Sequence, residues 1–486
     1  MRWWAVAFWL MAWQILSMQI GQEILIVSPV ATGKRMIWLI CGIRFWKIIL
    51  HSTIRIMGGF LLGIFAGSSA AVLAFRYKRI EELCYPMICV MKTTPVASVI
   101  ILLLMWISSG NLSVCIVFLM TFPILYTNVL EGLQHLNPKL NEMAEVFELP
   151  VCVRLRWIGI PQLMPYIKAG CALGIGLAWK AGTATEVIGI SGGTIGEMLY
   201  QAKIYLETAD LLAWTVMILV LSYVFEKLFL RMLDMAGERL KRMQISESRR
   251  VDKRKNISEE RQAAQQDIVL DHLSKSYGDH HVIQDLSQIF PCGQTTCIMA
   301  PSGSGKTTLL RLLMGMEIPD SGSIGGMDGR KKSAVFQEQI FGEDLSVYAN
   351  IRIVRKRKLF EPEKQEYEKI KTELEAVGLL GCMDQKVKEL SFGMRQRVAL
   401  VRAFYADWDV LFLDEPFRGL DKSTRELVLE YTKRKCSGKQ VLFITHDAEE
   451  KKLVIGKGWP VLLTIDKECS GIRMRFFLIN DKFRFG

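Results

Sequence analysis

The chain has 486 residues, half of them hydrophobic and 23% charged, with a formal net charge of +12. A chain of this length is too long for a single ordinary domain. A wholly soluble protein rarely has so many hydrophobic residues, so we expect the apolar residues to be clustered. The eleven cysteines form no CxxC pair and no Cys/His cluster at metal-ligand spacing, so we expect neither structural disulfides nor a zinc site. Basic residues flank the apolar runs, as in loops beside an anionic membrane surface, and no nucleic-acid partner is expected.

Residues 1–230 contain apolar runs long enough to enter a membrane, where about 20 residues cross the hydrocarbon as a helix. The six expected spans are residues 3–18, 56–75, two within 93–130, 165–189 and 211–225. The run 93–130 is broken by Ser108-Ser109-Gly110-Asn111, which predicts two spans joined by a tight turn. We interpret residues 3–18 as an uncleaved span, since no small-x-small cleavage site follows; a cleaved signal peptide is the alternative.

Six spans place both ends of this segment in the cytoplasm, together with the basic loop Arg76-Tyr77-Lys78-Arg79, as the positive-inside tendency predicts. The basic residues within 34–47 then fall outside, and we interpret part of residues 35–50 as an amphipathic helix along the membrane. Lys180 and Glu186 interrupt the fifth span. Either they line a water-filled passage, or they lie in its aqueous outer mouth.

Residues 231–266 are expected to form a charged linker, because they carry ten basic and six acidic residues up to Arg261 and few large apolar ones. The predicted domains are therefore a transmembrane domain at 1–230, this linker, and a domain at 267–486. The predicted fold class is an all-α transmembrane bundle of about six helices followed by an α/β P-loop domain.

A glycine-rich turn follows the apolar pair Ile298-Met299 and precedes an apolar helical run. It reads Ala300-Pro301-Ser302-Gly303-Ser304-Gly305-Lys306-Thr307-Thr308. A strand, such a turn and a helix start direct backbone N–H groups at phosphates. Lys306 is expected to reach the terminal phosphates of a nucleotide, and the Thr307 hydroxyl to ligate Mg²⁺.

Two carboxylates end the apolar run that begins at Val410. Asp414 is placed to hold Mg²⁺ directly or through water, and Glu415, one residue later, can orient or deprotonate an attacking water. His446 closes another apolar strand pattern and is expected beside the same site. A buried structural histidine is the alternative for His446.

With these motifs in order, residues 267–486 resemble the ATP-binding cassette family. Tyr277 looks like the aromatic residue that stacks on adenine, and Gln337 like the Q-loop glutamine that contacts magnesium. The run Leu390-Ser391-Phe392-Gly393-Met394-Arg395-Gln396-Arg397 looks like the family signature. The resemblance implies ATP contacts at Tyr277, Ser302, Gly303, Ser304, Gly305, Lys306, Thr307, Thr308 and Gln337. It implies contacts with the opposing subunit's ATP at Ser391, Gly393 and Asp421.

Two residues depart from the family pattern. The first glycine of the phosphate loop is Ala300, where a methyl group carries a small cost. The first glycine of the signature is Phe392, which puts a ring where the backbone approaches the other subunit's nucleotide. In a homodimer both sites would carry this ring, so we hypothesise that turnover is slowed but not abolished.

Residues 138–161 resemble the EAA loop of binding-protein-dependent importer permeases. The residues at the family's spacing are Glu142, Ala144, Ile158 and Pro161, while Met143 and Glu148 replace motif residues. A short charged helix on the cytoplasmic face can dock in a groove of the cassette and carry its closure to the spans. An ordinary amphipathic interface helix is the alternative.

Further segments, among them Thr94-Pro95-Val96-Ala97 and Trp179-Lys180, resemble the nitrate, sulfonate and taurine importers. This resemblance implies a multi-pass plasma-membrane importer subunit with a cytoplasmic cassette, using ATP and Mg²⁺ and pairing with itself. An extracytoplasmic binding protein would deliver a small solute: a sulfonate, taurine or nitrate-like anion, or a heterocycle like a thiamine precursor. The alternatives are an exporter half-transporter, which the EAA-like loop disfavours, and a non-pumping regulatory ABC membrane protein.

Overall fold

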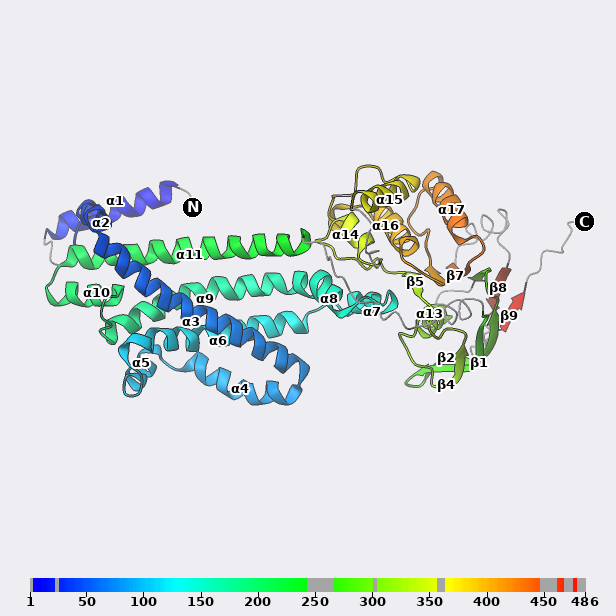
Figure 1. The fold of residues 1–486 in the computed structure, drawn as a ribbon, viewed down its shortest axis with the longest axis horizontal. Helices are drawn as coiled ribbons and strands as arrows, with labels where there is room; N and C mark the ends of the chain where they lie inside the picture. Colours follow the sequence, from blue (N-terminus) through cyan, green and yellow to red (C-terminus); the bar gives the residue numbers. More distant parts are fainter. Residues whose placement is uncertain are drawn as a thin grey trace, which may run out of the picture. The chain divides into compact units, whose positions relative to one another are not determined.

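The computed structural model describes residues 3–21, 26–242, 266–299, 304–355, 363–445, 461–466 and 475–478. The chain divides into two compact units, which we call the helical unit and the α/β unit. The helical unit comprises Met1–Leu136 and Ile160–Met243, and the α/β unit comprises Asn137–Gly159 and Gln244–Gly486. Residues 137–159 therefore pack with the α/β unit, although they interrupt the helical unit in the sequence (Figure 1).

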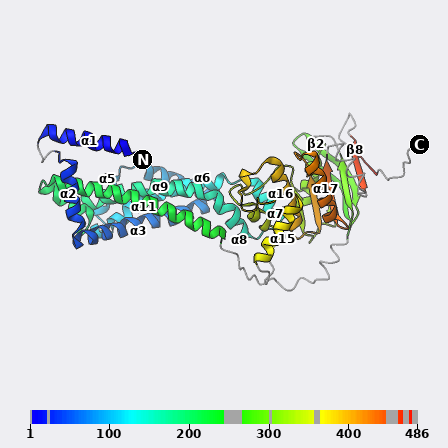
Figure 2. The same ribbon diagram turned by 90° about the horizontal axis from the view of Figure 1, so that it is seen from above.

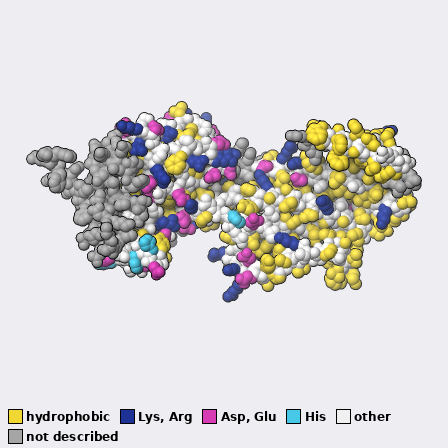
Figure 3. Space-filling view, turned by 180° about the vertical axis from the view of Figure 1, so that it is seen from behind, with side chains coloured by type: hydrophobic (Ala, Val, Ile, Leu, Met, Phe, Trp, Pro, Cys, Tyr) yellow, Lys and Arg dark blue, Asp and Glu magenta, His cyan; other side chains and the backbone are white. Residues whose placement is uncertain are grey.

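The helical unit consists of long apolar helices. They are α1 (Trp3–Ile20), α2 (Pro29–Ile40), α3 (Ile43–Arg76), α4 (Lys78–Thr93), α5 (Val96–Leu104), α6 (Ser109–Gln134), α9 (Ile160–Ile188), α10 (Ile195–Ile204) and α11 (Thr208–Arg242). Figures 1 and 2 show α3, α6, α9 and α11 running lengthwise beside one another. Large hydrophobic side chains cover much of the unit's visible face in Figure 3, as expected of helices that face lipid.

Three of the described helices are long and apolar enough to cross a membrane: α3, α6 and the Thr208–Gly237 part of α11. The pair α4 and α5 makes a fourth if it counts as one span. The first and fifth expected spans form α1 and α9, which are helical but are not among these three.

The first of the two spans expected within 93–130 overlaps a pair of helices and is not one continuous helix. Helix α4 ends at Thr93, Pro95 precedes α5, and the two helices are bent by 99°. Proline disfavours the α conformation in the residue before it and has no N–H to donate, which favours the break at Pro95, although α4 and α6 continue through Pro86 and Pro123. The predicted break near 108–111 is present, with α6 beginning at Ser109.

Three glycines let α3 and α6 approach closely. Gly59, Gly63 and Gly67 are spaced by four residues and therefore share one face of α3. A Cβ atom at Gly63 would lie 2.0 Å from Thr121 Oγ1, and at the other two it would lie 2.5 and 2.8 Å from backbone oxygens of α6. This small-residue spacing is typical of close helix pairs in membranes.

Glu186 occupies neither of the two expected positions. It is fully buried, and its Oε2 accepts hydrogen bonds from Ser52 Oγ at 2.8 Å and from Gly196 N at 3.2 Å. Ser52 Oγ in turn accepts from Ile195 N at 2.9 Å. A carboxylate is stabilised at a helix N-terminus, so Glu186 holds the start of α10 against α3 and α9. Lys180 is exposed.

The α/β unit contains two sheets. Its strands are β1 (Ile268–Tyr277), β2 (His280–Phe290), β3 (Thr295–Met299), β4 (Ser321–Gly325), β5 (Lys332–Val335), β6 (Val410–Asp414), β7 (Gln440–Thr445), β8 (Val461–Asp466) and β9 (Arg475–Leu478). The order β2-β1-β4 forms an antiparallel sheet, and the order β5-β6-β7-β3-β8-β9 is parallel except for β9.

The unit's helices are α7 (Pro138–Val146), α8 (Val151–Arg154), α13 (Lys306–Met314), α14 (Val347–Arg352), α15 (Glu363–Ala376), α16 (Phe392–Tyr405) and α17 (Lys422–Cys436). Short turns of π- and 3₁₀-helix occupy Leu155–Gly159 and Val387–Glu389. Strands β6 and β7 are buried throughout, as central strands covered on both faces are. Met299 pairs with Thr445 and Asp414 with Ile444, so β3, β6 and β7 end at one sheet edge.

We expect Gly63→Ala to destabilise the helical unit by roughly 1–3 kcal/mol, because its methyl group would overlap Thr121. The measurement is the thermal unfolding midpoint of the detergent-solubilised chain. Gly58→Ala is the matched control, since a Cβ there meets nothing within 4 Å, and it should leave the midpoint unchanged or raised. Equal midpoints for the two variants would contradict close packing of α3 on α6.

Candidate functional site

The phosphate-loop sequence leads directly into α13. Gly305 caps this helix in the left-handed conformation, with φ 82°, and Lys306 is its first residue. Ser304 Oγ is buried without a hydrogen-bond partner in the part of the chain that the structure describes. A buried hydroxyl and the N–H groups at a helix start fit a phosphate. The other predicted loop residues, Ser302 and Gly303, lie outside the described residues, as does Ala300.

Asp414 and Thr307 form the candidate magnesium site. Asp414 is 5% exposed at the end of β6, and Thr307 is hydrogen-bonded to its side chain. Burial, and next the charge of Glu415, raises the pKa of Asp414 to about 6. Among the described residues, no group of three His, Cys, Asp or Glu side chains could hold a metal alone. A magnesium ion at this hydroxyl and carboxylate would therefore take phosphate and water oxygens as its other ligands.

Lys306 and Glu415 complete this edge of the sheet. Lys306 is 8% exposed; burial lowers its pKa, while the nearby charges of Glu415 and Asp414 oppose that shift. Glu415 adopts a left-handed φ of 49°, which is unfavourable for a non-glycine residue by about 1–2 kcal/mol. Gln396 Nε2 supports this backbone by donating to the carbonyls of Glu415 at 3.3 Å and Pro416 at 3.0 Å. Such strain is typical of functional positions. His446 lies outside the described residues.

Tyr277 and Gln337 lie on different segments of the unit. Tyr277 ends β1 with a half-exposed ring; its hydroxyl donates to Glu317 and is also hydrogen-bonded to Thr308 in the first turn of α13. The structure thus puts an exposed aromatic ring beside the predicted phosphate loop. Gln337 is exposed on the segment after β5, next to Glu338, which pairs with Lys139 of α7.

The signature residues adjoin the segment before α17. Ser391 caps α16 by accepting from Met394 N at 3.3 Å, and Asp421 caps α17 by accepting from Thr424 N at 3.1 Å. A Cβ at Gly393 would lie 3.1 Å from Gly419 O. The role of Ser391, Gly393 and Asp421 at an opposing subunit's nucleotide stays a prediction.

Phe392 packs onto this same segment. Its ring is 50% exposed and lies against Gly419, where a Cβ atom would be 2.5 Å from ring carbon Cδ1. Gly419 adopts a φ of 75°, so only glycine suits both its backbone and the approach of the ring. The bulky side chain in the signature is therefore accommodated by a glycine two residues before Asp421.

The predicted coupling helix α7 docks on the rest of the α/β unit through an ion pair. Glu142 accepts two hydrogen bonds from Arg311, at 3.0 and 3.1 Å, and Arg311 lies on the last turn of α13. Ala144 is fully buried in the unit's core together with Leu140 and Met143. The helix that begins at Lys306 thus holds the loop at its other end.

Arg402 also contacts this loop, through Met143 and Phe147. Its guanidinium is buried, donates to Ile340 O at 2.7 Å and to Met143 Sδ at 3.1 Å, and lies over the rings of Phe341 and Phe147. Burial lowers the pKa of Arg402. The sequence reasoning missed both Arg311 and Arg402. The one signal for Arg402 is its position as a basic residue within the apolar run that follows the signature.

Two other residues of the EAA-like segment have distinct positions. Glu148, which stands where the family has glycine, adopts a left-handed φ of 48°. Glycine adopts this conformation without a steric penalty, which explains the family's preference for it. Pro161 lies in the first turn of α9 and so belongs to the helical unit, apart from α7.

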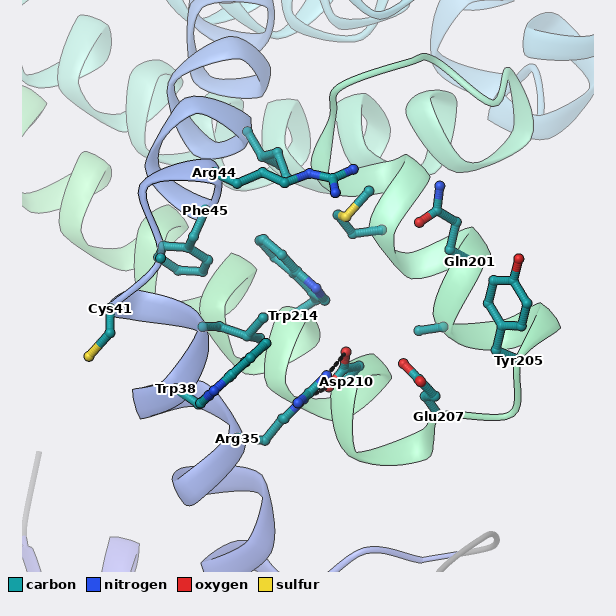
Figure 4. Close-up of a pocket in the computed structure, with 15 residues that line it drawn as sticks. Arg35, Trp38, Cys41, Arg44, Phe45, Gln201, Tyr205, Glu207, Asp210 and Trp214 are labelled. Carbon is teal, nitrogen blue, oxygen red and sulfur yellow. Dashed lines mark hydrogen bonds and ion pairs between the residues drawn. The ribbon is translucent and has the colours of Figure 1, made fainter.

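A pocket of about 650 Å³ opens in the helical unit where α2, α3, α10 and α11 meet (Figure 4). Arg35 is paired with Asp210 and stacks on Trp38, and buried Trp214 forms part of the lining. Arg44 reaches in from another side (Figure 4).

Part of residues 35–50 is expected to form an amphipathic helix along the membrane. The structure divides this range between α2 and the start of α3 at Cys41–Gly42, and a position of α2 along the membrane stays a prediction. The pocket brings two guanidinium groups and the carboxylates of Glu207 and Asp210 beside aromatic rings, with Arg35 and Asp210 paired to each other.

Residues 59–242 match the family described as "Binding-protein-dependent transport system inner membrane component", and residues 283–418 match the family described as "ABC transporter". These ranges together cover about two thirds of the chain.

Similar curated proteins include the "Sulfate/thiosulfate import ATP-binding protein CysA" of Gloeobacter violaceus, 37% identical over 197 residues, covering 38% of this chain and 56% of its own length. The protein of the same name from Ralstonia nicotianae is 36% identical over 197 residues, covering 38% and 53%. The chain thus spans about half the length of these relatives. It belongs to the ABC transporters, as a fusion of an import-type, binding-protein-dependent permease domain with an ATP-binding cassette.

Proposed function

We propose that the chain is one half of an ATP-driven importer in the cell membrane, with its cassette in the cytoplasm and a second copy completing the transporter. The bidentate pair between Glu142 and Arg311 carries this proposal, because it joins the loop between two permease helices to the helix that begins at Lys306. A movement of α13 on nucleotide binding would pull on α7, which is continuous with α6 and α9 through the chain.

The cassette residues take the following roles in this proposal. The Tyr277 ring stacks on adenine, the loop from Ser302 to Thr308 surrounds the phosphates, and Gln337 contacts the magnesium ion and senses the membrane domain. Thr307 and Asp414 hold Mg²⁺, which when bound would neutralise charge on the phosphate oxygens. Glu415, with His446, orients or deprotonates the water that attacks the terminal phosphate. Ser391, Gly393 and Asp421 complete the partner subunit's site.

The solute in this proposal is a small oxyanion such as a sulfonate, taurine or nitrate, delivered by an extracytoplasmic binding protein. The relatives are named as ATP-binding proteins for sulfate and thiosulfate import, and they match 38% of this chain. The pocket of Figure 4 adds support for a solute that also carries a positive charge, because it presents carboxylates as well as guanidinium groups. Taurine, with an ammonium and a sulfonate group, has this charge pattern.

Glu142→Ala should lower taurine uptake at least about fivefold while ATP hydrolysis continues, since a charged hydrogen-bonded pair contributes ~1.5–3 kcal/mol. The measurement is labelled taurine uptake and ATP hydrolysis in cells or vesicles that contain the full chain with its binding protein. Labelled sulfate and nitrate are run in parallel to identify the anion.

Glu145→Ala is the matched control on the same helix, because Glu145 is exposed and its ion pair with Arg154, at 3.5 Å, is long. It should keep uptake within about twofold of wild type. Glu415→Gln should lose both hydrolysis and uptake. Uptake that survives in Glu415→Gln, or solute leaving the cell instead of entering, would refute ATP-driven import.

Phe392→Gly is expected to raise ATP hydrolysis by about twofold or more, a change of ~0.4 kcal/mol in the barrier, because it removes the ring from the signature. The rate is measured for the full chain in lipid nanodiscs. Phe392→Tyr keeps the ring and should not raise the rate. An unchanged rate in Phe392→Gly would show that the ring does not slow turnover.

Acidification should weaken magnesium binding at Asp414. A carboxyl with a pKa of about 6 is about three-quarters protonated at pH 5.5, and a proton there competes with the metal. The Mg²⁺ concentration that half-saturates ATP binding should rise roughly fourfold between pH 7.5 and 5.5 beyond the effect of ATP's own titration. Asp414→Asn, which cannot titrate, gives that background, and an identical pH dependence in this variant would contradict the assignment.

The raised pKa of Asp414 affects the stability of the metal-free protein in the opposite direction: acidification weakens magnesium binding but stabilises the fold. The folded pKa lies above the ordinary value, so the folded state binds the proton more tightly than the unfolded state does. Ionised Asp414 therefore destabilises the metal-free fold above about pH 6, and this loss is relieved as the pH falls toward about 4.

A further inference from the structure

One carboxylate, Glu317, joins the candidate adenine ring to the coupling helix. Its Oε1 accepts from Arg311 Nε at 2.6 Å, and its Oε2 accepts from the hydroxyl of Tyr277. The other two donor nitrogens of Arg311 hold the carboxylate of Glu142. We call Tyr277, Glu317, Arg311 and Glu142 the four-residue network.

The network is shielded enough for its charges to matter. The side chains of Glu317, Arg311 and Glu142 are 20%, 31% and 32% exposed. Burial opposes ionisation of Glu317, but the hydrogen bonds from Tyr277 and Arg311 together lower its pKa below the ordinary value. Glu317 is therefore a carboxylate at neutral pH, and charge-assisted hydrogen bonds of this kind are the stronger ones.

The two ends of the network respond to different events. Tyr277 is also hydrogen-bonded to Thr308 in the first turn of α13, so a ring that moves to meet adenine changes its hydroxyl contacts. Arg311 divides its donors between two carboxylates, and a change at Glu317 alters what it offers to Glu142. Hydrogen bonds that share a donor group influence one another in this way.

We propose that Glu317 is a positioning residue that transmits nucleotide occupancy at Tyr277 to α7 through Arg311. This inference rests on the proposed function, because it requires ATP at the Tyr277 ring and coupling through α7. In this inference two connections join the nucleotide to α7. One runs from Lys306 at the phosphates along α13, and the other runs from Tyr277 at the adenine through Glu317.

The test measures hydrogen–deuterium exchange of residues 138–149 in the full chain in nanodiscs, with and without Mg-ATP. All proteins carry Glu415→Gln to prevent hydrolysis, and each variant is measured at an ATP concentration that saturates it. Glu317→Gln removes the charge, and Tyr277→Phe removes only the hydroxyl. Both should reduce the ATP-dependent change in exchange at 138–149 at least twofold. Glu368→Gln, on the exposed surface of α15, is the control and should leave it unchanged.

The outcomes separate the inference from the function beneath it. A change of the same size in Glu317→Gln, Tyr277→Phe and the control overturns the role of Glu317. No ATP-dependent change at 138–149 without these substitutions would instead refute coupling through α7. Exchange in β6 shows whether each variant is folded. If Glu317→Gln does not fold, Tyr277→Phe still tests the inference.

Discussion

The docking of α7 on the rest of the α/β unit depends on the guanidinium of Arg311. Three of its donors bind two carboxylates, one from α7 and one from the segment after α13. A lysine at this position would offer a compact charge without the planar fork and could not hold both in this geometry. Because Leu140 and Ala144 of α7 are also buried in the core of the α/β unit, apolar packing and the ion pair together fix a loop that interrupts the permease sequence.

The predicted fold class is confirmed, and much of the candidate site could be predicted because its signals are local. A strand, a glycine turn and a helix follow one another at Lys306, and an apolar strand ends at Asp414. Arg311 and Arg402 could not be predicted, since their partners in α7 lie 169 and 259 residues away in the sequence. Nothing near either arginine indicates which distant segment will cover it.

The helical unit shows the same division between local and distant information. Hydropathy located the apolar helices of this unit. It gives the length of each apolar run, but it does not show which distant residues will contact that helix. Glu186 was therefore expected near water, whereas distant Ser52 and the start of α10 supply the donors that make its burial tolerable. The bend at Pro95 was local in origin, yet its angle depends on how α5 packs against α6 and α9.

The glycine face of α3 limits which parts of the permease can move. Because backbone oxygens of α6 leave no room for a Cβ atom at Gly59 or Gly67, a lengthwise slide of one helix would drive the larger residues of α3 into them. Close packing at Gly59, Gly63 and Gly67 thus prevents the two helices from sliding, and we expect α3 and α6 to move together as one rigid body. We therefore expect any movement that opens a passage to take place between this helix pair and the other helices of the unit.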